Sequence, residues 1–252
     1  ESTFYLGIES SGAMALAFIF DEFNLTENTK LFIYDEEKSM HIGSFNSKNN
    51  NPSGTLSTAV VKSDRVIIEL TIPNIELIDL QLHMSIVTHD FLDLMNFHGE
   101  RTADRTDCND NVACSSADDW GDQVDAVVMV SSGGGVCSAA IVNNTAFDLE
   151  PYIIYAAHCN GGSSTVYFNY QSYSCSGNNP GNYNTMSGTQ TLAVGNFNSN
   201  DYALIKLNND IPSSYNAYYA GWSHSTSNPG NNVVGIHHAD GDIKKISYNA
   251  YG

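Results

Sequence analysis

Ile153-Ile154-Tyr155-Ala156-Ala157-His158-Cys159 is the stretch on which the fold prediction rests. Its β-branched and aromatic residues are typical of a strand, and the run stops at a histidine followed by a cysteine. A second apolar run, Asp201-Tyr202-Ala203-Leu204-Ile205, opens with an isolated aspartate 43 positions after His158 (201 − 158). The two runs predict two strands, with a histidine where the first ends and an aspartate where the second begins.

This pair, in this order, is typical of one kind of catalytic chemistry. Serine peptidases of the chymotrypsin type place a histidine base after one strand and its orienting aspartate at the mouth of a later strand, with the serine last in the chain. The base takes the serine proton, and the carboxylate holds the imidazole tautomer and stabilises the imidazolium. A single histidine is often a half-buried structural residue, but two matching sites in the right order favour catalysis. No Gly-Asp-Ser-Gly or similar nucleophile motif follows before Gly252.

The composition is that of a globular protein rich in turns. The 252 residues are enough for one large or two modest domains with cores of their own. Hydrophobic residues make up 42% and charged residues only 15%, while many Asn, Ser, Thr and Tyr residues favour strands and loops over helices. No sustained segment has the helical period of 3.6 residues. An all-β fold is therefore predicted.

The chain is strongly acidic, since 28 acidic and 10 basic side chains give a net charge of −18. Residues 1–100 carry 15 acids and 5 bases (net −10), and residues 101–252 carry 13 and 5 (net −8), so both halves are negative. Without a basic patch, nucleic acid and anionic membranes are not expected as partners. No window approaches 18 consecutive apolar residues, so no transmembrane helix is predicted. The chain begins at Glu1 without a signal sequence, which we expect to lie outside it or to have been removed.

The five cysteines are confined to one part of the chain: Cys108, Cys114, Cys137, Cys159 and Cys175. No CxxC pair and no histidine at metal-ligand spacing accompanies them, so neither zinc nor another cofactor is expected. Disulfides in an oxidising compartment are the better interpretation. The odd number predicts that one cysteine has its partner outside this chain.

The first hundred residues form a series of short strands separated by polar turns, with strands expected at 14–20, 31–34, 65–72 and 80–86. Residues 1–101 are therefore predicted to be a β-sandwich-like domain. We expect His83 and His89 at its surface or strand edges. A polar, charged segment from His98 to Asp107 then lacks apolar periodicity, which predicts a linker with two Arg-Thr bonds open to proteolysis.

Residues 102–252 are predicted to be a second domain. Strands are expected at 124–130, 136–142, 152–156, 166–170, 192–194 and 202–207, separated by turns rich in Gly, Asn and Ser. Six short strands of this kind suit a Greek-key barrel. Two further apolar pieces, at 233–236 and 243–246, predict the start of a second barrel that the 252 residues do not complete.

With these residues assembled, the chain resembles the lysyl endopeptidase group of secreted bacterial trypsin-like serine peptidases. The upstream residues, including Ser11-Gly12-Ala13, Gly54-Thr55-Leu56 and Val66-Ile67-Ile68-Glu69-Leu70, are similar to the propeptide domain of such precursors. The downstream matches are Cys108 to Cys114, Cys137-Ser138-Ala139-Ala140-Ile141-Val142-Asn143-Asn144, Ala157-His158-Cys159, Tyr170 to Cys175, Asp201 to Leu207, Ala220-Gly221-Trp222 and Ile236-His237-His238.

The resemblance implies a chymotrypsin-type double β-barrel and a secreted zymogen that hydrolyses polypeptides after basic residues, Lys and possibly Arg. His158 would be the general base and Asp201 its orienting carboxylate. The family pattern implies Cys137–Cys159 and Cys114–Cys175 disulfides, with Cys108 paired beyond this chain. The nucleophilic serine, the oxyanion hole and the specificity pocket would lie beyond Gly252, so residues 1–252 alone are predicted to be inactive. We expect the propeptide to be released at Arg101–Thr102, with Arg105–Thr106 second.

Two other functions remain open from the sequence. The chain could be a non-catalytic secreted protein, in which a β-sandwich binding module is fused to an inactive peptidase-like barrel. A carbohydrate-binding β-sandwich is a weaker alternative, suggested by the Tyr- and Asn-rich residues 167–184, which equally suit barrel loops. The sequence downstream of Gly252 would discriminate these alternatives from the peptidase.

Overall fold

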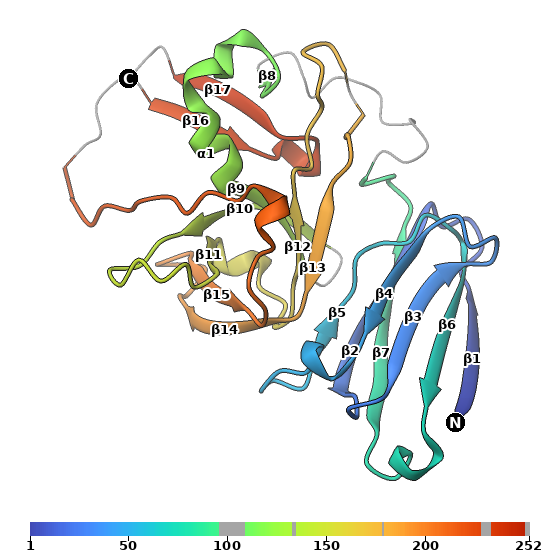
Figure 1. Cartoon of the computed structure of the whole chain (residues 1–252). Coiled ribbons are helices and arrows are strands. Elements are labelled where there is room, and N and C mark those ends of the chain that lie inside the picture. The colour runs from blue at the N-terminus through green and yellow to red at the C-terminus, as the bar shows by residue number, and fades with distance from the viewer. Residues whose placement is uncertain (96–108, 133–134, 178, 228–232, 250–252) are drawn as a thin grey trace.

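The computed structural model describes residues 1–95, 109–132, 135–177, 179–227 and 233–249 of the chain. Within these ranges the protein is built mainly of β-strands, arranged in an N-terminal sandwich and a C-terminal barrel (Figure 1). The all-β class and the chymotrypsin-type barrel predicted from the sequence are confirmed. The expected linker, with Arg101, Thr102, Arg105 and Cys108, lies outside the described residues.

The N-terminal sandwich consists of two antiparallel sheets whose apolar faces pack together. Alternate side chains of β6 (Arg65–Ile72) are buried, as expected for a strand with one face on a core. The shared core includes Phe18 and Phe20 from one sheet and Ile33 and Ile68 from the other. One sheet has the order β1 (Ser2–Glu9), β6, β3 (Lys30–Asp35), β4 (His41–Phe45), and the other has the order β5 (Leu56–Ser57), β2 (Ala15–Asn24), β7 (Gln81–Asp90).

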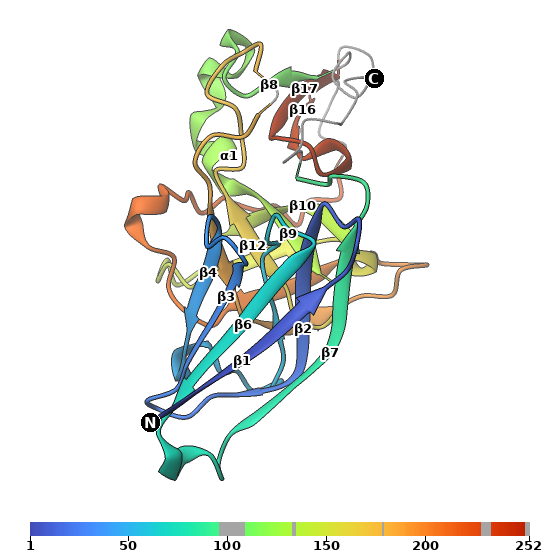
Figure 2. The same cartoon turned by 90° about the vertical axis from the view of Figure 1, so that its right-hand side faces the viewer.

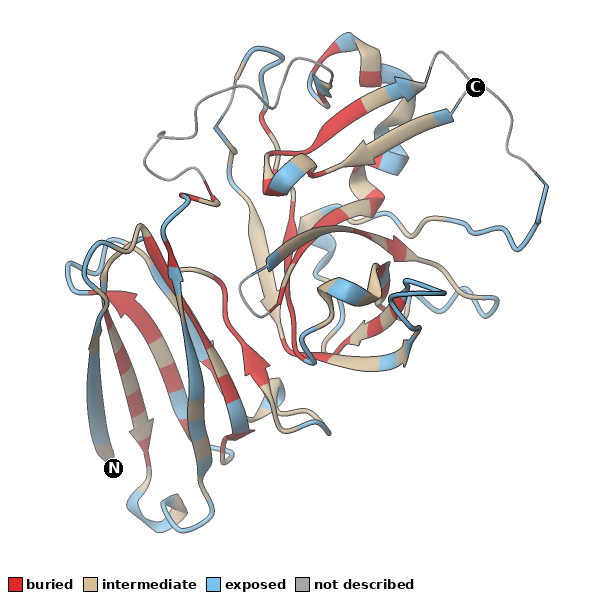
Figure 3. Ribbon diagram, turned by 180° about the vertical axis from the view of Figure 1, so that it is seen from behind, coloured by how far each residue is buried: buried red, intermediate tan, exposed pale blue. Residues whose placement is uncertain are grey.

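A seven-stranded antiparallel sheet curls into the barrel. In β15 (Ala203–Leu207) the residues Ala203, Ile205 and Leu207 are buried in the barrel core while the residues between them are partly exposed. Buried positions follow the same inner face in the neighbouring strands (Figure 3). The order is β13 (Asn184–Ser187), β12 (Thr165–Phe168), β9 (Val127–Ser132), β10 (Gly135–Val142), β11 (Tyr152–Tyr155), β15 and β14 (Thr189–Val194).

A three-stranded sheet follows, in the order β16 (Val233–His237), β17 (Lys245–Asn249), β8 (Asp110–Asn111). The 3-10 helix η3 (Ser115–Trp120) and the helix α1 (Gly121–Ala126) lie beside this sheet at the top of the barrel (Figure 1). None of the described helices has the length and apolar character that a membrane crossing requires.

Two sequence expectations about single elements were wrong. The strand expected from residue 124 begins at Val127, because residues 121–126 form α1, which buries Val124 and Ala126. A short apolar run fits a buried helix turn as well as a strand, so periodicity could not separate the two. The second error is an omission, because the strands β1, β4, β5, β8 and β13 were not anticipated.

The sandwich and the barrel share an apolar cluster. Ala59 and Met95 of the N-terminal part pack with Met129, Tyr167 and Tyr170 of the barrel, all nearly inaccessible to solvent. Figure 2 shows the sandwich strands lying across the barrel on this side. The two parts therefore form one continuous structure in this chain.

Candidate active site

Strand pairing brings the predicted histidine and aspartate together. β11 runs antiparallel to β15, with Tyr155 opposite Ala203. The C-terminal end of β11 therefore lies beside the N-terminal end of β15. His158 sits in the 3-10 helix η4 (Ala157–Cys159) just after β11, and Asp201 lies two residues before β15 begins.

Both carboxylate oxygens of Asp201 contact His158. Nδ1 of the imidazole lies 2.7 Å from Oδ2, and the backbone N–H of His158 donates to Oδ1 at 3.0 Å. Because a carboxylate only accepts, Nδ1 carries a proton, and in the neutral form of the ring Nε2 is then the acceptor. Partial desolvation would raise the pKa of Asp201, but the hydrogen bonds from the His158 ring and backbone outweigh it and lower that pKa. The aspartate is thus held ionised against the ring.

The pair is open to solvent. The His158 side chain is 51% exposed and that of Asp201 is 32% exposed. The ring of Phe197 packs edge-on against the imidazole, with 5.5 Å between ring centroids and 72° between their planes. Among the described residues no serine hydroxyl donates to Nε2 of His158. Phe197 was not identified from the sequence, because nothing local marks a loop aromatic four residues before the aspartate as a contact of the histidine.

The histidine loop is tied to the barrel by a disulfide. Cys159, next to His158, is bonded to Cys137 on β10, 22 positions earlier. The sulfurs of these cysteines and one imidazole nitrogen of His158 lie within 4.8 Å of one another, but the sulfurs are bonded together and are not free thiolates for a metal. A second disulfide joins Cys114 and Cys175, separated by 61 positions. Both pairs that the family resemblance implied are present.

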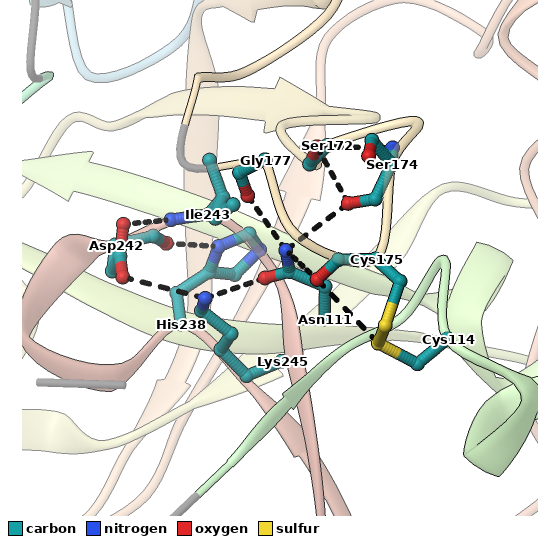
Figure 4. Close-up of polar contacts among 10 residues, drawn as sticks. All are labelled: Asn111, Cys114, Ser172, Ser174, Cys175, Gly177, His238, Asp242, Ile243 and Lys245. Carbon is teal, nitrogen blue, oxygen red and sulfur yellow. Dashed lines mark hydrogen bonds and ion pairs between the residues drawn. A yellow bond between two sulfur atoms is a disulfide. The ribbon is translucent and has the colours of Figure 1, made fainter. Parts of the chain in front are cut away.

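Asn111 and the second disulfide hold the loop after β12 in place (Figure 4). The Asn111 side-chain amide donates to the carbonyl oxygens of Ser174, Cys175 and Gly177, at 3.2, 2.9 and 2.6 Å. Its Oδ1 accepts from the buried ammonium of Lys245. These contacts are structural, because no solvent-exposed reactive group is among them.

The adjacent histidines His237 and His238 differ in burial, since His237 is partly buried and His238 is buried. His238 is buried, its backbone N–H donates to Ser138 Oγ at 2.8 Å, and its Nδ1 donates to the Asp242 carbonyl at 2.9 Å (Figure 4). Burial, aided by the charge of Lys244, lowers the pKa of His238 to about 3. Burial also lowers the pKa of Lys244 to about 7, and its Nζ donates to the Val124 carbonyl at 2.8 Å. These groups join the last sheet to α1.

A second His–Asp pair shows that hydrogen-bond geometry alone does not identify the site. His83 Nδ1 lies 2.6 Å from Asp21 Oδ1 on the N-terminal sandwich, and both side chains are at least half exposed. The pKa of His83 is raised and that of Asp21 lowered, chiefly by this hydrogen bond. It joins two neighbouring strands, β2 and β7, without an anchoring disulfide. As expected, His83 lies at the surface.

A barrel of this topology has the fold of the chymotrypsin-like serine peptidases, and it carries a carboxylate-bound histidine beside a disulfide at the ends of adjacent strands. Comparison with protein families narrows the class. The model of the family described as lysyl endopeptidase, C-terminal domain, matches residues 102–251, which is more than half of the chain. The chain belongs to the lysyl endopeptidase family, a family of peptide hydrolases.

Proposed function

We propose that the protein is the precursor of a secreted serine endopeptidase that cleaves polypeptides after basic residues. The observation that carries this proposal is the two-point contact between Asp201 and His158 on a barrel of the lysyl endopeptidase family. The contact holds Nδ1–H of an imidazole whose side chain is half exposed, which leaves Nε2 of the neutral ring to act as a general base. The two disulfides are consistent with an oxidising, extracellular location.

In this mechanism His158 takes the proton from the serine hydroxyl as that oxygen attacks the scissile carbonyl, and later gives it to the leaving amine. Asp201 holds Nδ1–H and stabilises the imidazolium that forms, without being protonated itself. The edge of Phe197 limits rotation of the ring. The nucleophile would be supplied from sequence beyond Gly252, which is why we propose that residues 1–252 alone do not hydrolyse peptides. The preference for Lys or Arg follows from the family by analogy.

The N-terminal sandwich would be the propeptide, released by cleavage at Arg101–Thr102 or next at Arg105–Thr106. Both bonds follow a basic residue within a polar segment, so an enzyme with the proposed specificity could make the cut itself. N-terminal sequencing of the mature enzyme tests this assignment. A mature start before Phe97 or after Cys114 would contradict it.

The activity test uses the full reading frame, expressed and assayed with chromogenic Lys and Arg peptides. His158→Ala should lower kcat by about 10⁴-fold or more, because the general base is lost and Asp201 no longer has an imidazole to orient. His83→Ala is the matched control, since it removes a second hydrogen-bonded His–Asp pair among the described residues, on the sandwich, and should leave kcat unchanged. A full-length protein that is inactive with every peptide would favour the non-catalytic alternative, and activity that survives in His158→Ala would refute the proposed base.

A further inference from the structure

The contact between the sandwich and the barrel is made by a short edge strand and its continuation, residues 56–60, which we call the docking segment. Ser57, Thr58 and Ala59 are 4%, 1% and 4% exposed. On the barrel side, Ser163 and Thr165 are 3% and 0% exposed. Such burial of polar residues requires that their hydrogen-bonding groups find partners across the contact.

Those partners come from β12 and the residues just before it. The Ser57 backbone N–H donates to Ser163 Oγ at 3.0 Å, and Thr165 Oγ1 donates to the Ser57 carbonyl at 2.9 Å. β5 stands at the edge of its sheet, paired on one side with β2. Side chains of the barrel therefore form hydrogen bonds with the backbone of β5 on the side where no other strand of the sandwich pairs with it.

Two tyrosines of the barrel complete the contact. The Val60 backbone N–H donates to the Tyr167 hydroxyl at 3.3 Å, and the Tyr170 hydroxyl donates to the Met95 carbonyl at 3.0 Å. Both rings are 1% exposed, in the apolar cluster that also contains Ala59. Removal of the sandwich would uncover these rings and break these four hydrogen bonds, together with a fifth from the Asn209 side-chain amide to the Lys48 carbonyl at 3.3 Å.

The charges of the two parts do not hold them together. Residues 1–100 have a net charge of −10 and residues 101–252 one of −8. The docking segment and its partners Ser163, Thr165, Tyr167 and Tyr170 are all uncharged. The attraction therefore rests on apolar burial and neutral hydrogen bonds, which salt does not screen.

The contact also leaves the His–Asp pair uncovered. The side-chain partners that the structure describes for His158 are Asp201 and Phe197, both on the barrel, and half of the imidazole surface remains accessible. We propose that the N-terminal sandwich stays bound to the barrel through the docking segment after the chain between them is cut, as a non-covalent subunit that does not occlude His158. The proposal depends on the proposed function in one respect, namely that the chain between sandwich and barrel is cut during processing of the precursor.

The test places a recognition sequence for a site-specific protease between Arg101 and Thr102 of the 252-residue chain. After complete cleavage, shown on a denaturing gel, the two pieces should co-elute in size-exclusion chromatography at the size of the uncut 27.4 kDa chain. The N-terminal piece contains no cysteine, so no disulfide can join the pieces. The complex should persist in about 1 M NaCl, because the two acidic parts repel less when screened.

Variants locate the contact. Tyr167→Phe removes only the hydroxyl that accepts from the Val60 backbone N–H of the docking segment, and should raise the Kd of the cut pieces about tenfold. Tyr155→Phe is the matched control, because the hydroxyl of that buried tyrosine bonds to Asn160 and Ser164 within the barrel, and its Kd should be unchanged. Ala59→Arg should separate the pieces after cleavage, while Ile75→Arg, at a position 85% exposed on the sandwich, should not.

Separation of the cut wild-type pieces at micromolar concentration would overturn the proposal. Equal Kd values for Tyr167→Phe and Tyr155→Phe would also overturn it, because the pieces would then be held by another surface than the docking segment. This comparison remains decisive even if Ala59→Arg does not fold. Neither result depends on peptidase activity, so a failure here is distinct from a failure of the proposed function.

Discussion

Replacing His238 by asparagine should reduce the loss in free energy of unfolding that the protein undergoes as the pH falls below neutral. Nδ1 of His238 is satisfied by the Asp242 carbonyl, but Nε2 is buried with no hydrogen-bond partner among the described residues. Protonation would place a charge on that buried nitrogen, next to Lys244 and His237. Desolvation is the main reason that the pKa of His238 falls from 6.5 to about 3. Asparagine can keep the donor to Asp242 while removing the group that titrates.

The sign and size of the effect follow from linkage. The folded-state pKa is about 3 and the unfolded value is 6.5, so the unfolded chain binds the proton first as the pH falls. The stability that neutral His238 contributes is fully present above pH 6.5 and is lost as the pH falls toward 3. Between about pH 7 and pH 4.5 the loss amounts to about 2.5 kcal/mol for a single group with these pKa values.

Urea unfolding followed by tryptophan fluorescence measures this change in the relevant part of the molecule. The two tryptophans, Trp120 and Trp222, both follow the sandwich in the chain, so the signal does not report the sandwich. His238→Asn should be less stable than wild type near neutral pH, because the smaller side chain leaves a cavity. Its free energy of unfolding should nevertheless fall by about 2.5 kcal/mol less than that of wild type between about pH 7 and pH 4.5.

His237→Asn is the matched control, because this neighbour on β16 is only partly buried. This substitution leaves the buried His238 ring and its bond to the Asp242 carbonyl in place, so the fall in stability at acid pH that His238→Asn removes should remain. Carboxyl groups that titrate in the same range are common to all three proteins and cancel in the comparison. Parallel profiles for wild type and His238→Asn would refute the reasoning, since His238 would then titrate alike in the folded and unfolded chains.

Three further predictions concern other groups. Lys244→Met should remove a rise in stability of about 2 kcal/mol between about pH 7 and pH 9, because the folded pKa of about 7 lies below the ordinary 10.5 and the folded chain sheds its proton first; urea unfolding that kept this rise would contradict the assignment. Replacing both Cys137 and Cys159 by serine should lower the free energy of unfolding by about 3 kcal/mol from the loop of 22 positions, and an unchanged denaturation midpoint would exclude that role. In the full-length enzyme Asp201→Asn should lower kcat about 10⁴-fold with little change in KM, because the imidazole loses its orienting carboxylate; a loss confined to KM would assign Asp201 to substrate binding.

Patterns formed by residues close together in the chain predicted several strands correctly. Apolar, β-rich runs predicted β6 and β15, and alternation of apolar and polar residues predicted β7. Such patterns failed at Val124, where a single turn of helix has no period to read. They also failed for β1, whose Phe4, Tyr5 and Leu6 are all at least 48% exposed, because its burial does not follow the alternation that marks a strand.

Contacts between distant residues could not be predicted in the same way. Lys244 and Lys245 would be placed at the surface by residue type, yet they are 1% and 2% exposed because Val124 and Asn111, more than a hundred positions earlier, supply acceptors for their ammonium groups. Nothing in the composition of residues 56–60 marks them as the segment that docks on β12. They dock there because Ser163 and Thr165 of the barrel supply hydrogen-bonding groups for the Ser57 backbone.

The sequence alone determined that His158 follows one strand and Asp201 precedes another, in the order of a peptidase, because strand ends and short motifs depend on residues close together in the chain. Only the tertiary structure decided that the two meet. The antiparallel pairing of β11 with β15 places Nδ1 of His158 2.7 Å from Oδ2 of Asp201, although the two residues are 43 positions apart in the chain. The same holds for the edge of Phe197, the buried nitrogen of His238 and the contact between sandwich and barrel. Each depends on which surfaces pack together, and packing is a property of the whole chain rather than of any segment.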